Sequence, residues 1–419
     1  MDFSRGRQYR AIPGPSVVPE SVLRAMHRAS PNIYEGEIIG MTETIVGDLR
    51  RIARTESDVA MYICNGHGAW ETALANMVGA GDRVLVCGID HFALGWGEVA
   101  KRLKAQVEFL DFGKRTPVDP ARVEERLRQD KTGQIKAVLV THVDTATSIR
   151  NDVAAVRQAM DRAGHAALLA ADCIASLACD RMEMDEWGVD VLVAASQKGL
   201  MLPPGLGFVL FNAKAGAVRS RLSDVSAYWD WVPRAKPKQF YEYFAGTAPT
   251  HHLFGLRASL DMLHAEGIEA VWARHEHLAH AIWAACDAWS QNGPLQLNVK
   301  DAVNRSRAVT SLRIGAPNGF QLRQWLEENT EVTLGIGLGM ADPGDQSALG
   351  YFRIGHMGHI NAHMVLGLLG AVQAGLEFLG IPHGPGGLDA AIRVISQPGC
   401  CSLPIPVKAR QQPGNVKHS

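Results

Sequence analysis

Seven short apolar runs alternate with stretches of helical character between residues 58 and 215. The runs are VAMYIC (59–64), RVLVCG (83–88), QVEFLDF (106–112), AVLVTHV (137–143), AALLAAD (166–172), VDVLVAAS (189–196) and GFVLFN (207–212). Nearly every position in these runs is apolar, which is typical of strands that are buried on both faces. Strands that alternate with helices in this way form parallel sheets. We therefore predict an α/β fold with a mostly parallel, seven-stranded sheet covered by helices on both faces.

The chain beyond residue 250 mixes strands and helices in a different order. Two long helices are expected at about 250–266 and 268–291. After them, apolar runs at 308–314, 331–337 and 352–356 are interspersed with helices at 319–328 and 360–380. This pattern indicates a smaller α+β domain. We divide the chain into an N-terminal segment that packs near the active site (1–20), a large domain (21–265), a small C-terminal domain (266–395) and a mobile tail (396–419).

Charge and composition exclude several classes of function. Lys and Arg number 42 against 43 Asp and Glu, which gives a net charge of -1. Because no basic field is available to hold a polyanion, we expect no nucleic-acid partner. The 16 histidines form no HExxH motif and the cysteines form no paired-ligand pattern, so we expect no metal.

The sequence also bears on the location of the protein. Its first residues, MDFSRGRQYR, lack the apolar stretch of a signal peptide. The apolar run at 364–381 is interrupted by Gln373, Glu377 and several glycines, so we expect a buried helix rather than a membrane span. The seven cysteines show no disulfide framework, and Cys400 and Cys401 fall in the tail. We expect a cytoplasmic protein with reduced cysteines and no membrane association.

Polar residues collect where the predicted strands end. In an open parallel sheet, ligands bind beyond the carboxyl ends of the strands. The turn NGHG (65–68) follows the first strand and opens a helix, Asp172 ends the run 166–172, and Lys198 follows the run 189–196. Taken singly, each has an ordinary structural interpretation: NGHG as a turn that caps a helix, Asp172 as a helix cap and Lys198 as a loop lysine. Together they supply what pyridoxal phosphate requires: a helix N-terminus for the phosphate, a carboxylate for the pyridine nitrogen and an amine for the Schiff base.

These features belong to a larger set of motifs. The chain resembles the class V branch of the fold-type I pyridoxal-phosphate aminotransferases, in particular the alanine–glyoxylate and serine–glyoxylate group. The resemblance covers about residues 8–395, and the lysine segment and FRIGHMG are its specific parts. The matching pieces are IPGPSVVPESVLRAM (12–26), NGHGAWE (65–71), HVDTATS (142–148), the run from Ala171 to Gly205, GTAP (246–249) and FRIGHMG (352–358).

The resemblance implies a role for each matching residue. Lys198 would carry the cofactor as an aldimine and shuttle the α-proton, and Asp172 would pair with the pyridine nitrogen. Arg353 would bind the substrate α-carboxylate, as arginine's planar fork suits a carboxylate. The other expected cofactor-binding residues are Asn65, Gly66, His67, Phe92, Thr145, Gln197 and Thr247, and the other expected substrate-binding residues are Gly14 and Tyr34. Thr247 matches a phosphate ligand that comes from the second subunit, which implies a homodimer with shared active sites.

Two departures from the family pattern concern loops near the site. The family places a glycine where this chain has Ser148, in ATSIR (146–150). The family's tyrosine shortly before the subunit-crossing threonine is replaced by Phe244, with Tyr243 beside it. The course of the first loop and the hydrogen bond of that tyrosine are therefore open.

The resemblance implies an aminotransferase that moves an amino group from alanine or serine to a 2-oxo acid such as glyoxylate or pyruvate by a ping-pong aldimine/ketimine mechanism. A related enzyme with aspartate, ureidoglycine or pyridoxamine as donor is the alternative. A cysteine desulfurase is disfavoured because Gln197 precedes the lysine and no cysteine lies between 287 and 399. A nicotinamide-dependent oxidoreductase would need a GxGxxG turn, which NGHGAW lacks. A non-catalytic binding protein would not need both Lys198 and Asp172.

Overall fold

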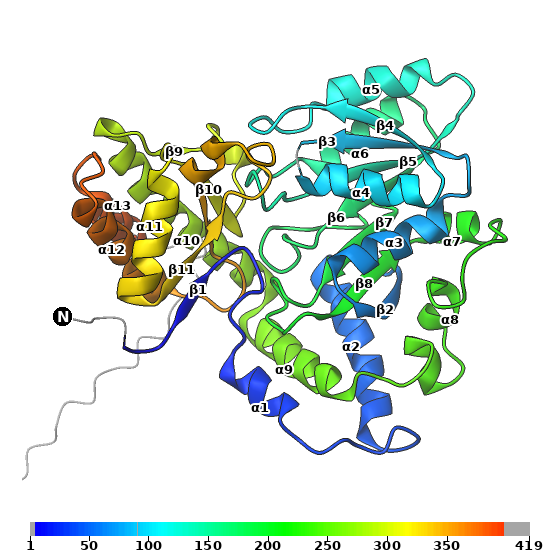
Figure 1. The fold of residues 1–419 in the computed structure, drawn as a ribbon. Helices are drawn as coiled ribbons and strands as arrows, with labels where there is room; N and C mark the ends of the chain where they lie inside the picture. The colour runs from blue at the N-terminus through cyan, green and yellow to red at the C-terminus, as the bar shows by residue number, and fades with distance from the viewer. Residues whose placement is uncertain (1–4, 90, 398–419) are drawn as a thin grey trace, which may run out of the picture.

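The computed structural model describes residues 5–89 and 91–397, and it contains two sheets that lie side by side (Figure 1). The seven-stranded sheet has the order β2-β8-β7-β6-β5-β3-β4, and only β8 runs antiparallel to its neighbours. The predicted mostly parallel, seven-stranded sheet is thereby confirmed. Its strands are β2 (Asp58–Cys64), β3 (Arg83–Gly88), β4 (Gln106–Asp111), β5 (Ile135–Thr141), β6 (Leu168–Asp172), β7 (Val191–Ala195) and β8 (Gly205–Phe211).

Helices follow most strands of this sheet, and polar caps set where several of them begin. Asp119, Asp152 and Asn212 each accept a hydrogen bond from a backbone N–H of the first turn, which satisfies a donor that the helix itself leaves unpaired. The helices of this part of the chain are α1 (Glu20–Met26), α2 (Glu37–Ala53), α3 (Gly66–Met77), α4 (His91–Arg102), α5 (Pro120–Gln129), α6 (Val153–Arg162), α7 (Ala213–Arg219), α8 (Trp231–Ala235), η1 (Phe240–Phe244) and α9 (Thr250–Glu266).

The second sheet is mixed and has five strands in the order β1-β11-β12-β10-β9. Its strands are β1 (Tyr9–Ala11), β9 (Gln296–Leu297), β10 (Val309–Arg313), β11 (Val332–Ile336) and β12 (Tyr351–Gly355). The strand β1, from the start of the chain, pairs in parallel with β11. In Figure 1 the dark-blue β1 therefore lies in the left lobe, although the chain that follows it enters the right lobe.

Helices of the second lobe pack around a core of their own. This core includes Leu312, Phe352 and Leu368, all fully or almost fully buried. The helices are α10 (Ile268–Trp289), α11 (Asn318–Thr330), α12 (Ala362–Phe378) and α13 (Gly387–Ile395), with short 3-10 turns η2 (Ser290–Asn292), η3 (Ala302–Asn304) and η4 (Gln346–Gly350). Within the described ranges, none of the helices combines the length and the apolar character that crossing a lipid bilayer requires. Cys400 and Cys401 lie outside the described residues, as does almost all of the expected tail.

Candidate active site

Two cavities meet at the carboxyl end of the large sheet, and Lys198 lines both. The inner cavity has a volume of about 110 Å³ and is lined by residues that include Gly66, Asp172 and Gln197. The outer cavity has a volume of about 600 Å³ and is lined by residues that include Gly14 and Arg353. Phe92 and Thr145 also belong to both linings. The structure thus brings most of the expected site residues together around one amine.

Lys198 follows β7 in a tight loop that is closed by the N-terminal segment. Its Nζ donates a hydrogen bond to the carbonyl oxygen of Pro13. Ser16 holds the same loop, since its backbone N–H donates to the Gln197 carbonyl (2.9 Å) and its Oγ donates to the Lys198 carbonyl (2.7 Å). Burial and, after it, the nearby charge of Arg353 lower the pKa of Lys198 to about 8, although Asp172 opposes this effect. The amine is therefore easier to deprotonate than an ordinary lysine.

Gly14 contacts this amine directly. Its φ is +95°, a left-handed value that favours glycine. A Cβ atom at this position would lie 2.4 Å from the Nζ of Lys198, closer than any real contact allows. A side chain at residue 14 would therefore strain the backbone and displace the amine of Lys198.

Asp172 is the last residue of β6 and is almost fully buried. Its Oδ1 accepts a hydrogen bond from the backbone N–H of Ile174 (2.8 Å), and its Oδ2 accepts one from Nε1 of Trp70 (2.9 Å). Burial raises the pKa of this carboxyl to about 7 despite these two donors. Each oxygen keeps a lone pair for a further donor. A cation placed in the inner cavity would stabilise the ionised form.

The turn after β2 presents the N-terminus of α3 to the inner cavity. Gly66 and His67 line the cavity, and the first backbone N–H groups of a helix form a ready site for an anion. Asn65 caps the helix, because its Oδ1 accepts from the N–H of His67 (3.0 Å) and of Gly68 (3.3 Å). Asn65 is exposed and is not part of the inner-cavity lining. Its direct contact with a cofactor stays a prediction.

The chemistry of the inner cavity matches a phosphorylated pyridine. Asp172 offers a carboxylate, Lys198 an amine and α3 a helix N-terminus, while Phe92 contributes an aromatic ring. Gln197 adds a second signal, as its buried Oε1 has no hydrogen-bond partner among the described residues. A buried acceptor without a donor is costly, so a ligand group that donates a hydrogen bond to this oxygen would remove that cost. Pyridoxal phosphate fits this set of groups.

Arg353 reaches the outer cavity from β12 and is held by backbone carbonyls. Its Nε donates to the oxygen of Ile336 (2.6 Å) and its Nη1 to the oxygen of Thr145 (2.6 Å). The side chain is 6% exposed, so its charge lies largely out of water. A partly desolvated guanidinium that lines the same cavity as the lysine is suited to bind a carboxylate.

Besides Asn65, two expected site residues lie outside both cavities. Thr247 is exposed and Tyr34 is 88% exposed, and neither belongs to the lining of the inner or outer cavity. Within one chain the structure does not bring these two residues to Lys198. Their assignment to the site depends on a second subunit.

The two departures from the family pattern have local explanations. Ser148 has φ +63°, so this position takes the left-handed conformation that glycine would favour. The buried Asp144 holds the loop, because its Oδ1 accepts from the N–H of Ala146 and of Thr147, and its carbonyl accepts from the N–H of Ser148. Phe244 is buried in the large core, where no hydrogen bond is needed.

Sequence reasoning missed Trp70, which orients the carboxylate of Asp172. The signal was present, because Trp70 lies four residues after Gly66 on one helix, and residues with this spacing share a face. Pro13 and Ser16 were also missed as partners of the lysine loop. No pattern within their own segment indicates where Lys198 lies.

Comparison with known proteins agrees with this site. The family model "Aminotransferase class-V" matches residues 18–348. A serine–glyoxylate aminotransferase of Arabidopsis thaliana is 34% identical, with 91% of this chain and 93% of the relative covered. An L-aspartate–glyoxylate aminotransferase of Paracoccus denitrificans is also 34% identical, with 88% and 91% covered. The crystal structure of a ureidoglycine–glyoxylate aminotransferase from Bacillus subtilis superposes with a TM-score of 0.84 at 23% identity, covering 95% of this chain and all of that one, which supports the fold.

Proposed function

The chain belongs to the class-V aminotransferase family, whose members depend on pyridoxal phosphate, and from that premise we propose that it transfers the amino group of serine or alanine to glyoxylate or pyruvate. One observation supports this proposal above all: Lys198 lines both cavities. Asp172 lines the inner cavity and Arg353 lines the outer one. A cofactor in the inner cavity and an amino acid in the outer cavity would thus both reach the same amine.

Each residue of the chain has a defined task in this proposal. Lys198 would hold the cofactor through its amine and move a proton at its Nζ, and its lowered pKa leaves neutral amine available near pH 8. Asp172 would hold the pyridine nitrogen, and a cation there would keep its carboxylate ionised. The backbone of Gly66 and His67 and the amide N–H group of Gln197 would hold the phosphate. When bound, pyridoxal phosphate supplies the electron sink for the carbanion that transamination requires.

Arg353 orients the amino acid. A two-pronged contact with the α-carboxylate would use the fork of the guanidinium, while Nε and Nη1 stay anchored to two carbonyls. Gly14 leaves room for the amine of Lys198 itself, beside the N-terminal segment that closes this side of the site.

A scan of amino donors against glyoxylate and pyruvate tests the proposal. We expect serine or alanine to give the highest kcat/KM, and we expect Lys198→Ala to abolish turnover while the protein stays folded. A Lys198→Ala protein with activity near that of the wild type would contradict the assignment of the amine. Lys214→Ala, which removes a lysine paired with Asp190, serves as the control and should keep its activity.

A donor with a second carboxylate is the second candidate, because the outer cavity holds another arginine. Arg323 on α11 lines this cavity, and its buried Nε has no hydrogen-bond partner among the described residues. Burial lowers the pKa of this group, and Glu327 one turn away opposes that effect. If aspartate is the better donor, Arg323→Gln should lower kcat/KM for aspartate and leave that for alanine unchanged.

We further propose that the active site is completed by a second copy of the chain. The exposure of Thr247 and Tyr34 supports this, because both would be free to reach a neighbour's phosphate and substrate. Mixing a Lys198→Ala chain with a Thr247→Ala chain tests it. One of the two sites in the heterodimer has neither defect, so activity should reappear. A protein that stays monomeric at working concentration would exclude this arrangement.

We also propose a cytoplasmic location. It is supported by cysteines that are unpaired in the described part of the chain: Cys64, Cys87, Cys173, Cys179 and Cys286. Fractionation of cells that make the protein would test the location.

A further inference from the structure

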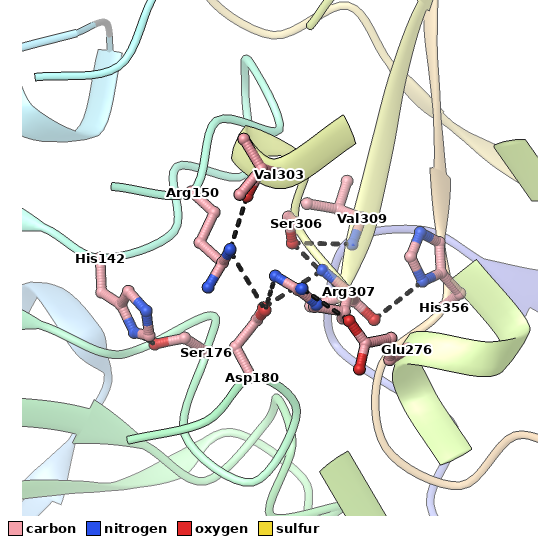
Figure 2. A network of polar contacts seen from close by, with 11 residues as sticks. His142, Arg150, Ser176, Asp180, Glu276, Val303, Ser306, Arg307, Val309 and His356 are labelled. Atoms are coloured by element: carbon pink, nitrogen blue, oxygen red, sulfur yellow. Dashed lines mark hydrogen bonds and ion pairs between the residues drawn. The ribbon is translucent and has the colours of Figure 1, made fainter. Parts of the chain in front are cut away.

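A cluster of charged side chains, three of them largely buried, connects the two lobes (Figure 2). We call it the lobe-joining cluster, and it consists of Arg150, Asp180, Glu276 and Arg307. The side chain of Asp180 is fully buried, and those of Arg150 and Arg307 are 22% and 16% exposed. Oδ1 of Asp180 lies 3.5 Å from Nη1 of Arg307 and 3.9 Å from Nε of Arg150. Nη2 of Arg307 pairs with Oε1 of Glu276 on α10 (2.7 Å).

On the side of the large lobe, hydrogen bonds connect this cluster to Asp172. Asp180 lies at the end of the segment of turns that begins after Asp172. Ser176, in the middle of that segment, hydrogen-bonds Nδ1 of His142 (2.9 Å). The backbone N–H of His142 donates to the carbonyl of Asp172 (2.9 Å). The large-sheet side of the cluster is therefore tied to the residue that faces the cofactor.

The other side continues to the substrate arginine. Arg307 lies two residues before β10, and its carbonyl accepts a hydrogen bond from Nδ1 of His356 (3.0 Å), just beyond β12. On the paired strands, Ser311 lies opposite Arg353. Arg307 is therefore connected to Arg353 through the paired strands β10 and β12, while Arg353 itself also donates to the Thr145 carbonyl of the large lobe.

The cluster is poorly arranged for stability alone. Asp180 accepts one hydrogen bond, from the backbone N–H of Arg307 (3.2 Å). Its Oδ1, Nη1 of Arg307 and Nε of Arg150 are buried and have no hydrogen-bond partner among the described residues. Buried ion pairs seldom repay their desolvation unless the geometry is good. A role in fixing the relative position of the lobes accounts for the presence of such a cluster.

Asp180 separates two positive charges that come from different lobes. Arg150 belongs to the loop after β5 and Arg307 lies two residues before β10, and burial followed by the charge of Arg307 lowers the pKa of Arg150. Without a carboxylate between them, the two guanidinium groups would repel each other with little water to screen them. We propose that Asp180 is a positioning residue that holds Arg353 at the correct distance from Lys198 by keeping Arg150 and Arg307 together. This inference rests on the proposed binding of the substrate carboxylate by Arg353.

Asp180→Asn in the cofactor-loaded enzyme tests this role, because it removes the charge and keeps the shape. We expect KM for the amino donor to rise by about ten- to a hundredfold with a smaller change in kcat, as a displaced binding group costs up to that much. The affinity for pyridoxal phosphate and the visible absorbance of the bound cofactor should stay unchanged, because Lys198 and Asp172 lie within the large lobe.

Asp190→Asn is the matched control. Asp190 is also buried and also lies between two cations, Arg157 (3.6 Å) and Lys214 (3.1 Å). It precedes β7 at the opposite end of the sheet, within the large lobe. Both variants should lower the unfolding temperature, but only Asp180→Asn should raise KM. Equal KM values for Asp180→Asn and the wild type would overturn the inference.

A second-site variant tests the repulsion itself. Adding Arg150→Gln to Asp180→Asn removes one of the two opposed cations, so KM should return toward the wild-type value. A double variant with the KM of the single variant would contradict the role of repulsion. Glu276→Gln is the alternative if Asp180→Asn does not fold. It weakens the ion pair between Arg307 and the half-exposed Glu276, so it should raise KM by a smaller factor. If the proposed function is wrong, the wild type itself shows no transamination, which distinguishes that failure from this one.

Discussion

Nε1 of Trp70 donates a hydrogen bond of 2.9 Å to Oδ2 of Asp172, which connects a helix of the large lobe to the last residue of β6. This bond sets the orientation of a carboxylate that no other described side chain contacts by a hydrogen bond. The other oxygen is held by a backbone N–H, so the plane of the carboxylate is defined from both sides. A pyridine nitrogen in the inner cavity would meet an acceptor that is already oriented.

Trp70→Phe should lower kcat because it removes this donor while it keeps an aromatic ring at the position. A hydrogen bond to a charged group contributes about 1.5–3 kcal/mol, so we expect a loss of about tenfold to a hundredfold. Steady-state kinetics with saturating cofactor provides the measurement. Trp96→Phe is the control, since Trp96 stacks on Trp70 at 6.2 Å and has a long bond of 3.4 Å to a carbonyl. Similar losses in both variants would indicate a packing role.

Gly14→Ala should inactivate the enzyme, because its Cβ would occupy the position of the Lys198 amine. Gly36→Ala is the matched control, as Gly36 has a similar φ of +100° but open space around its Cβ position. Both substitutions carry a backbone strain of about 1–3 kcal/mol, which thermal unfolding would reveal. Only Gly14→Ala should lose activity, by at least about tenfold, because it displaces the reacting amine. Equal activity in the two variants would show that the lysine can move aside.

Arg353→Ala should lower kcat/KM by roughly tenfold to several hundredfold, because it leaves the substrate carboxylate unpaired. Arg353→Lys should fall between this variant and the wild type, since it keeps the charge but loses the fork and the bonds to Ile336 and Thr145. Cofactor binding, followed by visible absorbance, should change little in both. An Arg353→Ala protein that loses its cofactor but binds substrate normally would show that another residue binds the substrate carboxylate.

The rate at which the cofactor-free protein recombines with pyridoxal phosphate should rise with pH. The neutral amine is the nucleophile, and burial lowers the pKa of Lys198 from 10.5 to about 8. The rate should therefore level off above that pH, whereas an ordinary lysine would show a rise that continues past pH 10. In Arg353→Ala the midpoint should move to higher pH, because a nearby cation that disfavours the ammonium form has been removed. Stopped-flow absorbance would measure both midpoints.

The seven apolar runs are an example of what the sequence determines by itself. Whether a short segment forms a strand or a helix depends largely on neighbours a few positions away. The spacing of apolar residues in the sequence therefore indicates it directly. The ends of β6 and β7 then place Asp172 and Lys198 at one edge of the sheet, because parallel strands end on the same side. For this reason two central residues of the site could be inferred from local sequence.

The contacts that complete the site were decided by the tertiary structure alone. Lys198 meets Pro13 across 185 positions of sequence, and Arg353 meets the carbonyl of Thr145 across 208. The sequence showed no sign that β1 would pair with β11, or that Asp180 would stand between arginines of two lobes. Such contacts arise from the packing of whole lobes, in which each side chain meets partners that no local periodicity specifies.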